Sequence, residues 1–294
     1  MATTVIAGSA SIELATKIAK KLNAQLIIPK TRIFPDGEQK ISFNKPKKGK
    51  IVVVQSTHPP VDANLFQALC LIFQARQFAP NIIAVMPYVG YARQDKSFLS
   101  GEITTISVIA SLLKEVGASQ FIVVDIHSNI ALHYFHKIRN LTAVPLLANY
   151  FKKFHLKDPI VVSPDLYWRQ NAKKFAQQLG LKSYALHKQR NRKTGKLTIK
   201  KSHLPNIEGH DIILLDDMLS SGNTIVTASQ YLRKRNCGKI FVACTHAILV
   251  KGAEEKIRKS GVTKIISTNT IPNPTNEVDV SEMIANSIQQ MRSR

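Results

Sequence analysis

The sequence has few cysteines and no long apolar run. Its three cysteines are Cys70, Cys237 and Cys244, and their separations do not match those of metal-binding cysteines. An odd number, with two of them in apolar segments, predicts reduced and buried thiols rather than a disulfide framework. No apolar run approaches the ~20 residues that span a bilayer. The N-terminal residues lack the basic start and the cleavage site of a signal peptide. We therefore expect a cytoplasmic protein that makes no membrane contact.

Acidic residues are scarce relative to basic ones. The chain has 19 Asp and Glu against 41 Lys and Arg, which gives a formal net charge of +22. Such an excess favours anionic partners, either nucleic acid or phosphate-rich small molecules, and it does not choose between them. The lysines are spread along the chain, as at Lys17, Lys20 and Lys21, which is typical of a solvated surface.

The chain is long enough for two domains. It has 294 residues and 44% hydrophobic content, which is typical of a globular protein with sizeable cores. Strand-like apolar runs alternate with helical patterns, and this alternation predicts parallel sheets built from crossover units. The rhythm repeats in the second half, without a low-complexity linker. We predict an α/β fold with two similar domains, residues 1–141 and 142–294, each a mostly parallel sheet flanked by helices.

One stretch, residues 212–224, organises the chain. Four apolar residues, 212–215, predict a strand buried on both faces, and Asp216 and Asp217 mark its carboxyl end. A small-residue loop follows and leads into a helix, an arrangement that suits a phosphate. Carboxylates cannot help an anion, so the acid pair indicates sugar hydroxyls or a metal. Although a lone loop of this kind is more often structural, the adjacent acids favour a sugar phosphate.

This stretch resembles the signature of the phosphoribosyl pyrophosphate family, which includes type I phosphoribosyltransferases and ribose-phosphate pyrophosphokinases. The resemblance implies two phosphoribosyltransferase-like domains. It also implies that Asp216 and Asp217 hold the ribose hydroxyls and that the loop binds the 5-phosphate of ribose 5-phosphate. The loop residues are Ser220, Ser221, Gly222, Asn223 and Thr224, where many members end in Gly-Gly-Thr or Ala-Gly-Thr.

Two motifs of the first half decide between the branches of this family. Residues 34–38, Phe-Pro-Asp-Gly-Glu, read on their own as an exposed turn. Residues 87–96 form a strand end with aromatics, a Gly bend and polar groups that suit a nucleotide. Both resemble motifs of ribose-phosphate pyrophosphokinases. The resemblance implies ATP-binding roles for Phe34, Asp36, Glu38, Arg93 and Gln94. It also implies a homo-oligomer in which the loop 34–38 reaches a neighbouring subunit.

Two further residues follow buried strands and resemble the family's magnesium positions. His127 ends the run Val-Val-Asp-Ile-His, and a histidine at the carboxyl end of a strand lies at a site edge. Asp165 belongs to a Ser-Pro-Asp motif, after which Tyr167 and Trp168 replace the family's Gly-Gly. The resemblance implies that His127 is a ligand of Mg²⁺ and that Asp165 serves the metal through metal-bound water or else contacts the ribose site.

A basic hairpin from residue 186 to 201 contains Lys188 and Arg190. Its cations would suit a nucleic-acid backbone, and a solvated loop is the common alternative. The Lys-x-Arg pattern resembles the catalytic pair of the family, and diphosphoryl transfer needs cations that meet charge as it develops.

Together these motifs predict an archaeal-like ribose-phosphate pyrophosphokinase. It would convert ATP and ribose 5-phosphate to phosphoribosyl pyrophosphate and AMP. A type I phosphoribosyltransferase is disfavoured because the nucleotide motifs would then have no use. A non-catalytic regulatory subunit of the same fold is a further alternative, and the intact His127, Lys188 and Arg190 argue against it. Charge alone motivates a nucleic-acid binder, and we expect no nucleic-acid partner.

Overall fold

A computed structural model describes residues 2–190, 197–199 and 204–291. The chain divides into two compact units. Of the described residues, the first unit takes 2–142, 270–272 and 280–291, and the second takes 143–190, 197–199, 204–269 and 273–279. Each unit has its own parallel sheet flanked by helices, as predicted from the sequence. Among the described residues, no helix combines the length and the apolar character needed to cross a bilayer.

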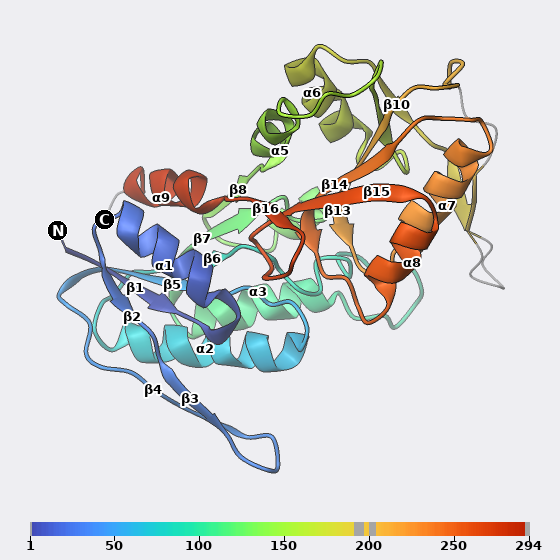
Figure 1. The fold of residues 1–294 in the computed structure, drawn as a ribbon. Helices are drawn as coiled ribbons and strands as arrows, with labels where there is room; N and C mark the ends of the chain where they lie inside the picture. The colour runs from blue at the N-terminus through green and yellow to red at the C-terminus, as the bar shows by residue number, and fades with distance from the viewer. Residues whose placement is uncertain (1, 191–196, 200–203, 292–294) are drawn as a thin grey trace. The chain divides into compact units, whose positions relative to one another are not determined.

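The first unit is built on a six-stranded sheet in the order β2-β1-β5-β6-β7-β8, in which every pairing is parallel. Residues Val52 and Val53, neighbours in β5, are both fully or almost fully buried, which is expected where helices cover both faces of a parallel sheet. Helices α2 and α3 pack on one face through a single apolar cluster, while α1 and α9 lie together on the other (Figure 1). The strands are β1 (Ala2–Ala7), β2 (Gln25–Ile27), β5 (Gly49–Val54), β6 (Ile82–Met86), β7 (Ala118–Val124) and β8 (Ile138–Leu141); the helices are the 3-10 turn η1 (Ser9–Ser11), α1 (Ile12–Lys21), α2 (Val61–Arg76), α3 (Thr105–Glu115), α4 (Asn129–Leu132) and α9 (Ser281–Gln289).

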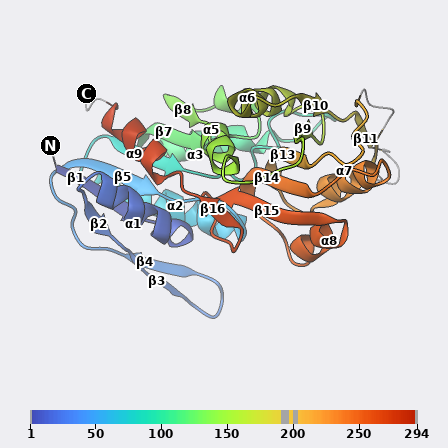
Figure 2. The same ribbon diagram turned by 45° about the horizontal axis from the view of Figure 1, so that its top comes forward.

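An antiparallel hairpin, β3 (Lys30–Ile33) and β4 (Gln39–Ser42), projects from the first unit (Figures 1 and 2). All four residues of β3 are exposed, and Ile33 has 68% of its surface open to solvent. The hairpin therefore presents its tip away from the core of its own unit.

The second unit repeats the design with the strand order β10-β9-β13-β14-β15-β16. Strand β13 is buried throughout, and its residues alternate between two cores: Ile212 and Leu214 join the cluster under α7 and α8, whereas Ile213 and Leu215 join the cluster under α5 and α6. This alternation follows from the two-residue period of a strand. The strands are β9 (Ile160–Ser163), β10 (Ser183–Ala185), β13 (Ile212–Leu219), β14 (Ile240–Ala247), β15 (Val262–Thr268) and β16 (Asn276–Val278), with a small pair β11 (Lys188–Arg190) and β12 (Leu197–Ile199); the helices are α5 (Val144–Phe151), α6 (Arg169–Leu179), α7 (Asn223–Arg233) and α8 (Ala253–Lys259).

The C-terminal helix α9 belongs to the first unit, whereas the sequence-based division places residues 142–294 together. The ammonium of Lys50 donates to the carbonyls of Ile288 at 3.2 Å and Met291 at 2.7 Å, which satisfies backbone acceptors at the end of the helix. Arg139 donates to the carbonyl of Ser287 at 3.2 Å. These partners lie far away in the sequence, so the return of the chain to its first unit is a tertiary effect.

Candidate functional site

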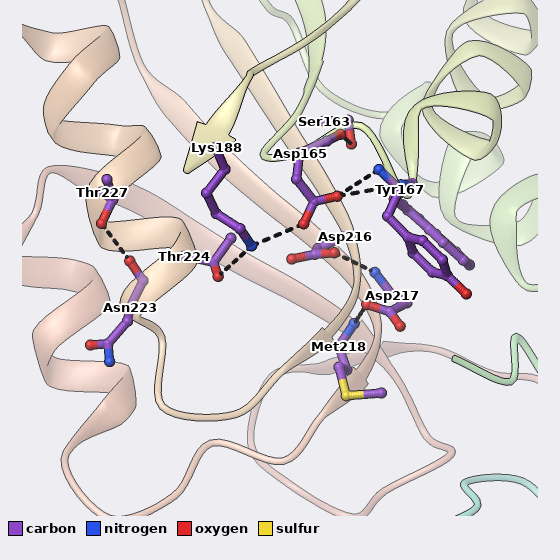
Figure 3. Close-up of polar contacts among 11 residues, drawn as sticks. Ser163, Asp165, Tyr167, Lys188, Asp216, Asp217, Met218, Asn223, Thr224 and Thr227 are labelled. Atoms are coloured by element: carbon purple, nitrogen blue, oxygen red, sulfur yellow. Dashed lines mark hydrogen bonds and ion pairs between the residues drawn. The ribbon is translucent and has the colours of Figure 1, made fainter. Parts of the chain in front are cut away.

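The acid pair lies inside strand β13 rather than beyond its end, because the strand continues to Leu219. Asp216 is 9% exposed and Asp217 is 4% exposed. The Asp217 N–H donates to Asp216 Oδ1 at 3.0 Å, and the Met218 N–H donates to Asp217 Oδ1 at 2.8 Å (Figure 3). Each carboxylate is thus oriented by the backbone of the residue that follows it.

Burial makes Asp216 an unfavourable place for a negative charge. Loss of water raises the pKa of the Asp216 carboxyl well above its ordinary value, and the charges of Asp217 and Asp165 raise it further. Three carboxylates therefore gather at one edge of the sheet. A cation or a set of hydroxyl donors placed there would relieve the repulsion.

The loop after β13 is shaped by one glycine. Gly222 has a φ of +75°, and a Cβ at this position would lie 2.8 Å from Ile257 Cγ1 and 3.4 Å from the carbonyl oxygen of Ala253. Helix α8 packs so closely against the loop that only glycine fits. Helix α7 begins at the next residue, and its N-cap glycine has no side chain that could accept from the first N–H groups of the helix. Free N–H groups at a helix start suit an anion, and the phosphate-binding role of this loop stays a prediction.

Asn223 and Thr224 have different partners in the structure. The Asn223 amide oxygen accepts a hydrogen bond from the Lys256 ammonium, so this side chain is bound to helix α8. The Thr224 hydroxyl lies 3.3 Å from Lys188 Nζ. Of these two residues, Thr224 therefore contacts the predicted catalytic strand.

Lys188 joins the loop to the Ser-Pro-Asp segment. Its ammonium lies 3.0 Å from Asp165 Oδ2 and 3.3 Å from Thr224 Oγ1 (Figure 3). About a quarter of each side chain of the Lys188–Asp165 pair is exposed, at 24% and 23%. The structure thus brings together three residues that the sequence placed in separate motifs, on β11, after β9 and at the start of α7.

The hairpin that carries Lys188 is described only in part. Arg190 ends strand β11, where its backbone pairs with Leu197 of β12. The Arg190 side chain and residues 191–196 and 200–203 lie outside the described part of the chain.

The nucleotide motifs of the first unit are anchored internally. Gln94 Oε1 accepts a hydrogen bond from Thr105 Oγ1 at 2.6 Å, and the carbonyl of Gln94 accepts one from the Ile106 N–H at 3.4 Å. Gln94 therefore holds the start of α3. Arg93, the preceding residue, is exposed.

The segment Gln55-Ser56-Thr57 is buried after strand β5 and fastens three neighbouring segments. Gln55 Oε1 accepts from the Ala10 N–H at 3.1 Å, and Thr57 Oγ1 accepts from the Gly90 N–H at 2.7 Å. These bonds tie the strand end to the turns on either side of it. The segment thus has a structural role.

Phe34, Asp36 and Glu38 lie at the tip of the β3–β4 hairpin. The guanidinium of Arg32 lies 5.0 Å from the centre of the Phe34 ring, and Asp36 Oδ1 accepts from the Glu38 N–H at 3.2 Å. Both acids are exposed. The tip is pre-shaped by these contacts and open to solvent.

The two predicted metal ligands belong to different units. His127 follows β7 in the first unit, and Asp165 follows β9 in the second. Among the described residues, no three or more His, Cys, Asp or Glu side chains form a group that could hold a metal ion. Mg²⁺ is commonly held by one or two carboxylates together with substrate phosphates. Asp165, whose outer oxygen already pairs with a cation, fits that mode of binding.

The carboxyl end of β14 holds polar residues that sequence reasoning did not single out. Thr245 and His246 are each 1% exposed, and His246 pairs in register with Met218, next to Asp217. The apolar run 240–243 is followed by Cys244, Thr245 and His246. A histidine at the carboxyl end of a buried strand is the same signal that singled out His127.

The fold and the site define a class of protein before any relative is considered: two α/β units built on parallel sheets, one with a buried acid pair beside a glycine loop at a helix start. Residues 3–117 match the family described as the N-terminal domain of ribose phosphate pyrophosphokinase, and residues 183–294 match the phosphoribosyl synthetase-associated domain. The chain belongs to the ribose-phosphate pyrophosphokinase family and is an enzyme of this type.

Individual relatives cover nearly the whole chain. The ribose-phosphate pyrophosphokinase of Methanothermobacter thermautotrophicus is 35% identical, over 96% of this chain and 98% of its own length. That of Methanopyrus kandleri is 34% identical, over 98% and 99%. The crystal structure of phosphoribosylpyrophosphate synthetase from Mycobacterium smegmatis superimposes with a TM-score of 0.87 at 30% identity, covering 98% of each chain. The similarity therefore includes both units and is strongest to archaeal members among these relatives.

Proposed function

We propose that this enzyme transfers the β,γ-diphosphoryl group of ATP to the C1 hydroxyl of ribose 5-phosphate, giving phosphoribosyl pyrophosphate and AMP. The observation that carries the proposal is the position of Lys188. One ammonium contacts both Asp165 and Thr224, and so stands between the acid cluster and the anion loop. A cation in that place suits the transfer of a charged group onto a phosphorylated sugar.

The second unit would bind the sugar. Asp216 and Asp217 offer buried acceptor oxygens, and the ribose hydroxyls supply donors that relieve their repulsion. The N–H groups at the start of α7, with the hydroxyls of Ser220, Ser221 and Thr224, would bind the 5-phosphate. Gly222 allows the close packing that gives this loop its shape.

The reaction itself is an in-line displacement at the β-phosphorus. The C1 oxygen of the sugar forms the new P–O bond and loses its proton, the bond between the α–β bridging oxygen and the β-phosphorus breaks, and AMP leaves with the bridging oxygen. Lys188 and Arg190 would meet the negative charge that develops on the transferring group. Bound Mg²⁺ would neutralise the phosphates, and Asp165 and His127, each in its own unit, would be candidate ligands.

The first unit would bind ATP. Phe34, Asp36 and Glu38 present an aromatic face and two acceptors at an exposed tip, and we propose that they serve the adenine of a neighbouring subunit's nucleotide. Arg93 and Gln94 are both exposed, and Gln94 can donate through its amide N–H groups while its Oε1 accepts from Thr105. Arg93 also brings a positive charge, which favours it for a phosphate.

A homo-oligomer is supported by apolar side chains on the outer faces of α2 and α3. Phe66 and Phe73 of α2 are each 55% exposed, and Val108 and Leu112 of α3 are 47% and 45% exposed. Clusters of exposed apolar side chains are typical of protein interfaces. We propose that a second copy of the chain covers this face.

We further propose that the enzyme works in the cytoplasm. The three cysteines form no disulfide, and Cys237 and Cys244 are buried, which suits a reducing compartment.

The identity of the nucleotide product tests the proposed function. Purified protein is incubated with ATP and Mg²⁺, with and without ribose 5-phosphate, and the nucleotides are separated chromatographically. AMP must form only when the sugar phosphate is present. Formation of ADP would mean transfer of the terminal phosphoryl group and would contradict the proposal.

A further inference from the structure

Both described partners of Lys188 are groups to which the proposed function gives another task. Asp165 would serve the metal, and Thr224 would serve the sugar phosphate. In the structure the Lys188 ammonium holds both, at 3.0 Å and 3.3 Å. A divalent cation on Asp165 Oδ2 would repel the Lys188 ammonium from the same oxygen, so this contact must change when the metal arrives. The Thr224 contact can stay, because a hydroxyl can accept from Lys188 and donate to a phosphate at the same time.

Asp165 is held in place without help from Lys188. Its Oδ1 accepts from the N–H groups of Tyr167 at 3.0 Å and Trp168 at 3.4 Å, and its carbonyl accepts from the Ser163 hydroxyl at 2.7 Å. Only Oδ2 meets Lys188. The carboxylate is therefore fixed through one oxygen and presents the other to whichever cation is available.

The surroundings of Asp165 favour a positive charge beside its carboxylate both without and with bound substrates. The negative charge of Asp165 is one of the causes that disfavour ionisation of the buried Asp216, so the two carboxylates repel each other. A positive charge on Oδ2 offsets that repulsion. In the ligand-free protein, Lys188 supplies it.

We propose that Asp165 is a cation-exchange position, which rests on the proposed function. Asp165 holds the Lys188 ammonium in the resting enzyme and exchanges it for the divalent cation that arrives with the nucleotide. The Thr224 hydroxyl can keep its contact with Lys188 while it donates to the sugar phosphate. Lys188 then loses its ionic partner and is released to the transferring group. Asp165 is thus a positioning residue for Lys188. Substrate binding frees the Lys188 ammonium to act on the transferring group.

The exchange predicts that Lys188 competes with divalent metal for Asp165. We test it with Mn²⁺ alone, without ATP or ribose 5-phosphate. Unbound Mn²⁺ is counted by electron paramagnetic resonance, and Trp168 fluorescence is followed in the same titration. Trp168 is the chain's single tryptophan, and its backbone N–H donates to Asp165, so the fluorescence reports on this position.

Lys188→Met should bind Mn²⁺ on the order of ten-fold more tightly than the wild type, since removing one partner of a partly buried ion pair leaves the other charge uncompensated. Lys256→Met is the matched control. Lys256 bonds Asn223 of the same loop, so its removal deletes one positive charge without touching Asp165. Lys256→Met should shift Mn²⁺ affinity by less than about two-fold, as expected for a screened surface charge.

Asp165→Asn should weaken Mn²⁺ binding and abolish the tightening in the double variant with Lys188→Met. Lys188→Arg keeps the charge and should bind Mn²⁺ about as the wild type does, and Lys188→Gln replaces the Met variant if that variant folds poorly. Equal tightening by Lys188→Met and Lys256→Met would reduce the effect to general electrostatics and overturn the proposal, as would no tightening at all. A failed diphosphoryl assay with intact Mn²⁺ competition would refute the proposed function and leave the exchange standing.

Discussion

Asp216 and Asp217 are neighbours in one buried strand, and each accepts a hydrogen bond from the backbone of the next residue. Buried carboxylates are costly unless they are paired, so this pair is unfavourable for stability and favourable for binding. Ribose hydroxyls that donate to these oxygens in the complex would offset this loss of stability. At the residue scale the account therefore depends on what each carboxylate gains when the sugar binds.

Asp217→Ala should weaken ribose 5-phosphate binding by about ten- to a hundred-fold, because a hydrogen bond to a charged group contributes about 1.5–3 kcal/mol. The affinity for ATP should stay nearly constant. Isothermal titration of each substrate measures both quantities, with circular dichroism as the control for folding. Unchanged sugar affinity in a folded variant would make the acid pair structural.

Asp216→Asn should stabilise the protein at neutral pH. The folded-state pKa of Asp216 lies well above its ordinary value, because of burial and then of Asp217 and Asp165. The folded state therefore retains a proton that the unfolded state has lost, and the free energy of unfolding falls as the pH rises from about 4 through the folded pKa. Asparagine cannot ionise, so the free energy of unfolding of Asp216→Asn does not fall for this reason. Its Tm should exceed that of the wild type at pH 7 and approach it near pH 4.

Calorimetric Tm values across a pH series check this prediction. Asp36→Asn, at the exposed hairpin tip, is the control and should leave the Tm unchanged at every pH. A gain for Asp216→Asn that is equal at pH 4 and pH 7 would show that ionisation is not its cause.

At the scale of elements, the loop between β13 and α7 depends on its contact with α8. Gly222 has a positive φ and no room for a Cβ, whereas Gly180 has a φ of +67° with nothing within 4 Å of the same position. Both glycines have a positive φ that would strain another residue, but of the two only Gly222 has atoms close to the Cβ position. They therefore form a natural pair for comparison.

Gly180→Ala should cost about 1 kcal/mol of unfolding free energy from strain alone. Gly222→Ala should cost roughly 1–3 kcal/mol more, because the added methyl displaces Ile257, and it should also weaken ribose 5-phosphate binding. Urea unfolding and sugar titration measure both effects. Equal losses of stability in the two variants, with sugar binding intact, would rule out a role for the loop's packing.

The elements also show which features of the structure could be predicted from the sequence. The strand–loop–helix of residues 212–224 could be predicted because its signals are local: an apolar run, two acids and a glycine. The engagement of Gln55 and Gln94 could not, since their partners Ala10 and Thr105 lie 45 and 11 residues away and meet them only in the folded unit. The Lys188–Asp165 pair, 23 residues apart, is of the same kind.

For the whole molecule, alternating patterns predicted the α/β class and the two parallel sheets correctly. They could not show that α9 packs with the first unit, because the helix has an ordinary amphipathic face and its partners Lys50 and Arg139 are more than a hundred residues earlier. Family resemblance named candidate residues, and the structure shows which of them meet within a unit. His246 was missed although its strand-end signal was present.

Lys50→Met should loosen α9 from the first unit. Lys50 donates to two carbonyls at the helix end, so its loss should cost about 1–2 kcal/mol and raise amide exchange in α9 but not in α5 of the second unit. Lys21→Met is the control. Lys21 pairs with the largely exposed Glu282 at 3.3 Å, so this change should cost at most about 1 kcal/mol. Unaltered exchange in α9 after Lys50→Met would mean that apolar packing alone holds the helix.

The fate of the β-phosphorus tests the central claim most directly. ATP with oxygen-18 in the non-bridging positions of its β-phosphate is incubated with the enzyme, Mg²⁺ and ribose 5-phosphate, and the products are followed by phosphorus NMR, in which oxygen-18 shifts the resonance of the phosphorus that carries it. Attack of the sugar hydroxyl at the β-phosphorus predicts that the label moves entirely to a diphosphate on C1 of the sugar, with unlabelled AMP formed in equal amount. Label retained in a nucleotide diphosphate, with a single phosphoryl group added to the sugar, would contradict diphosphoryl transfer.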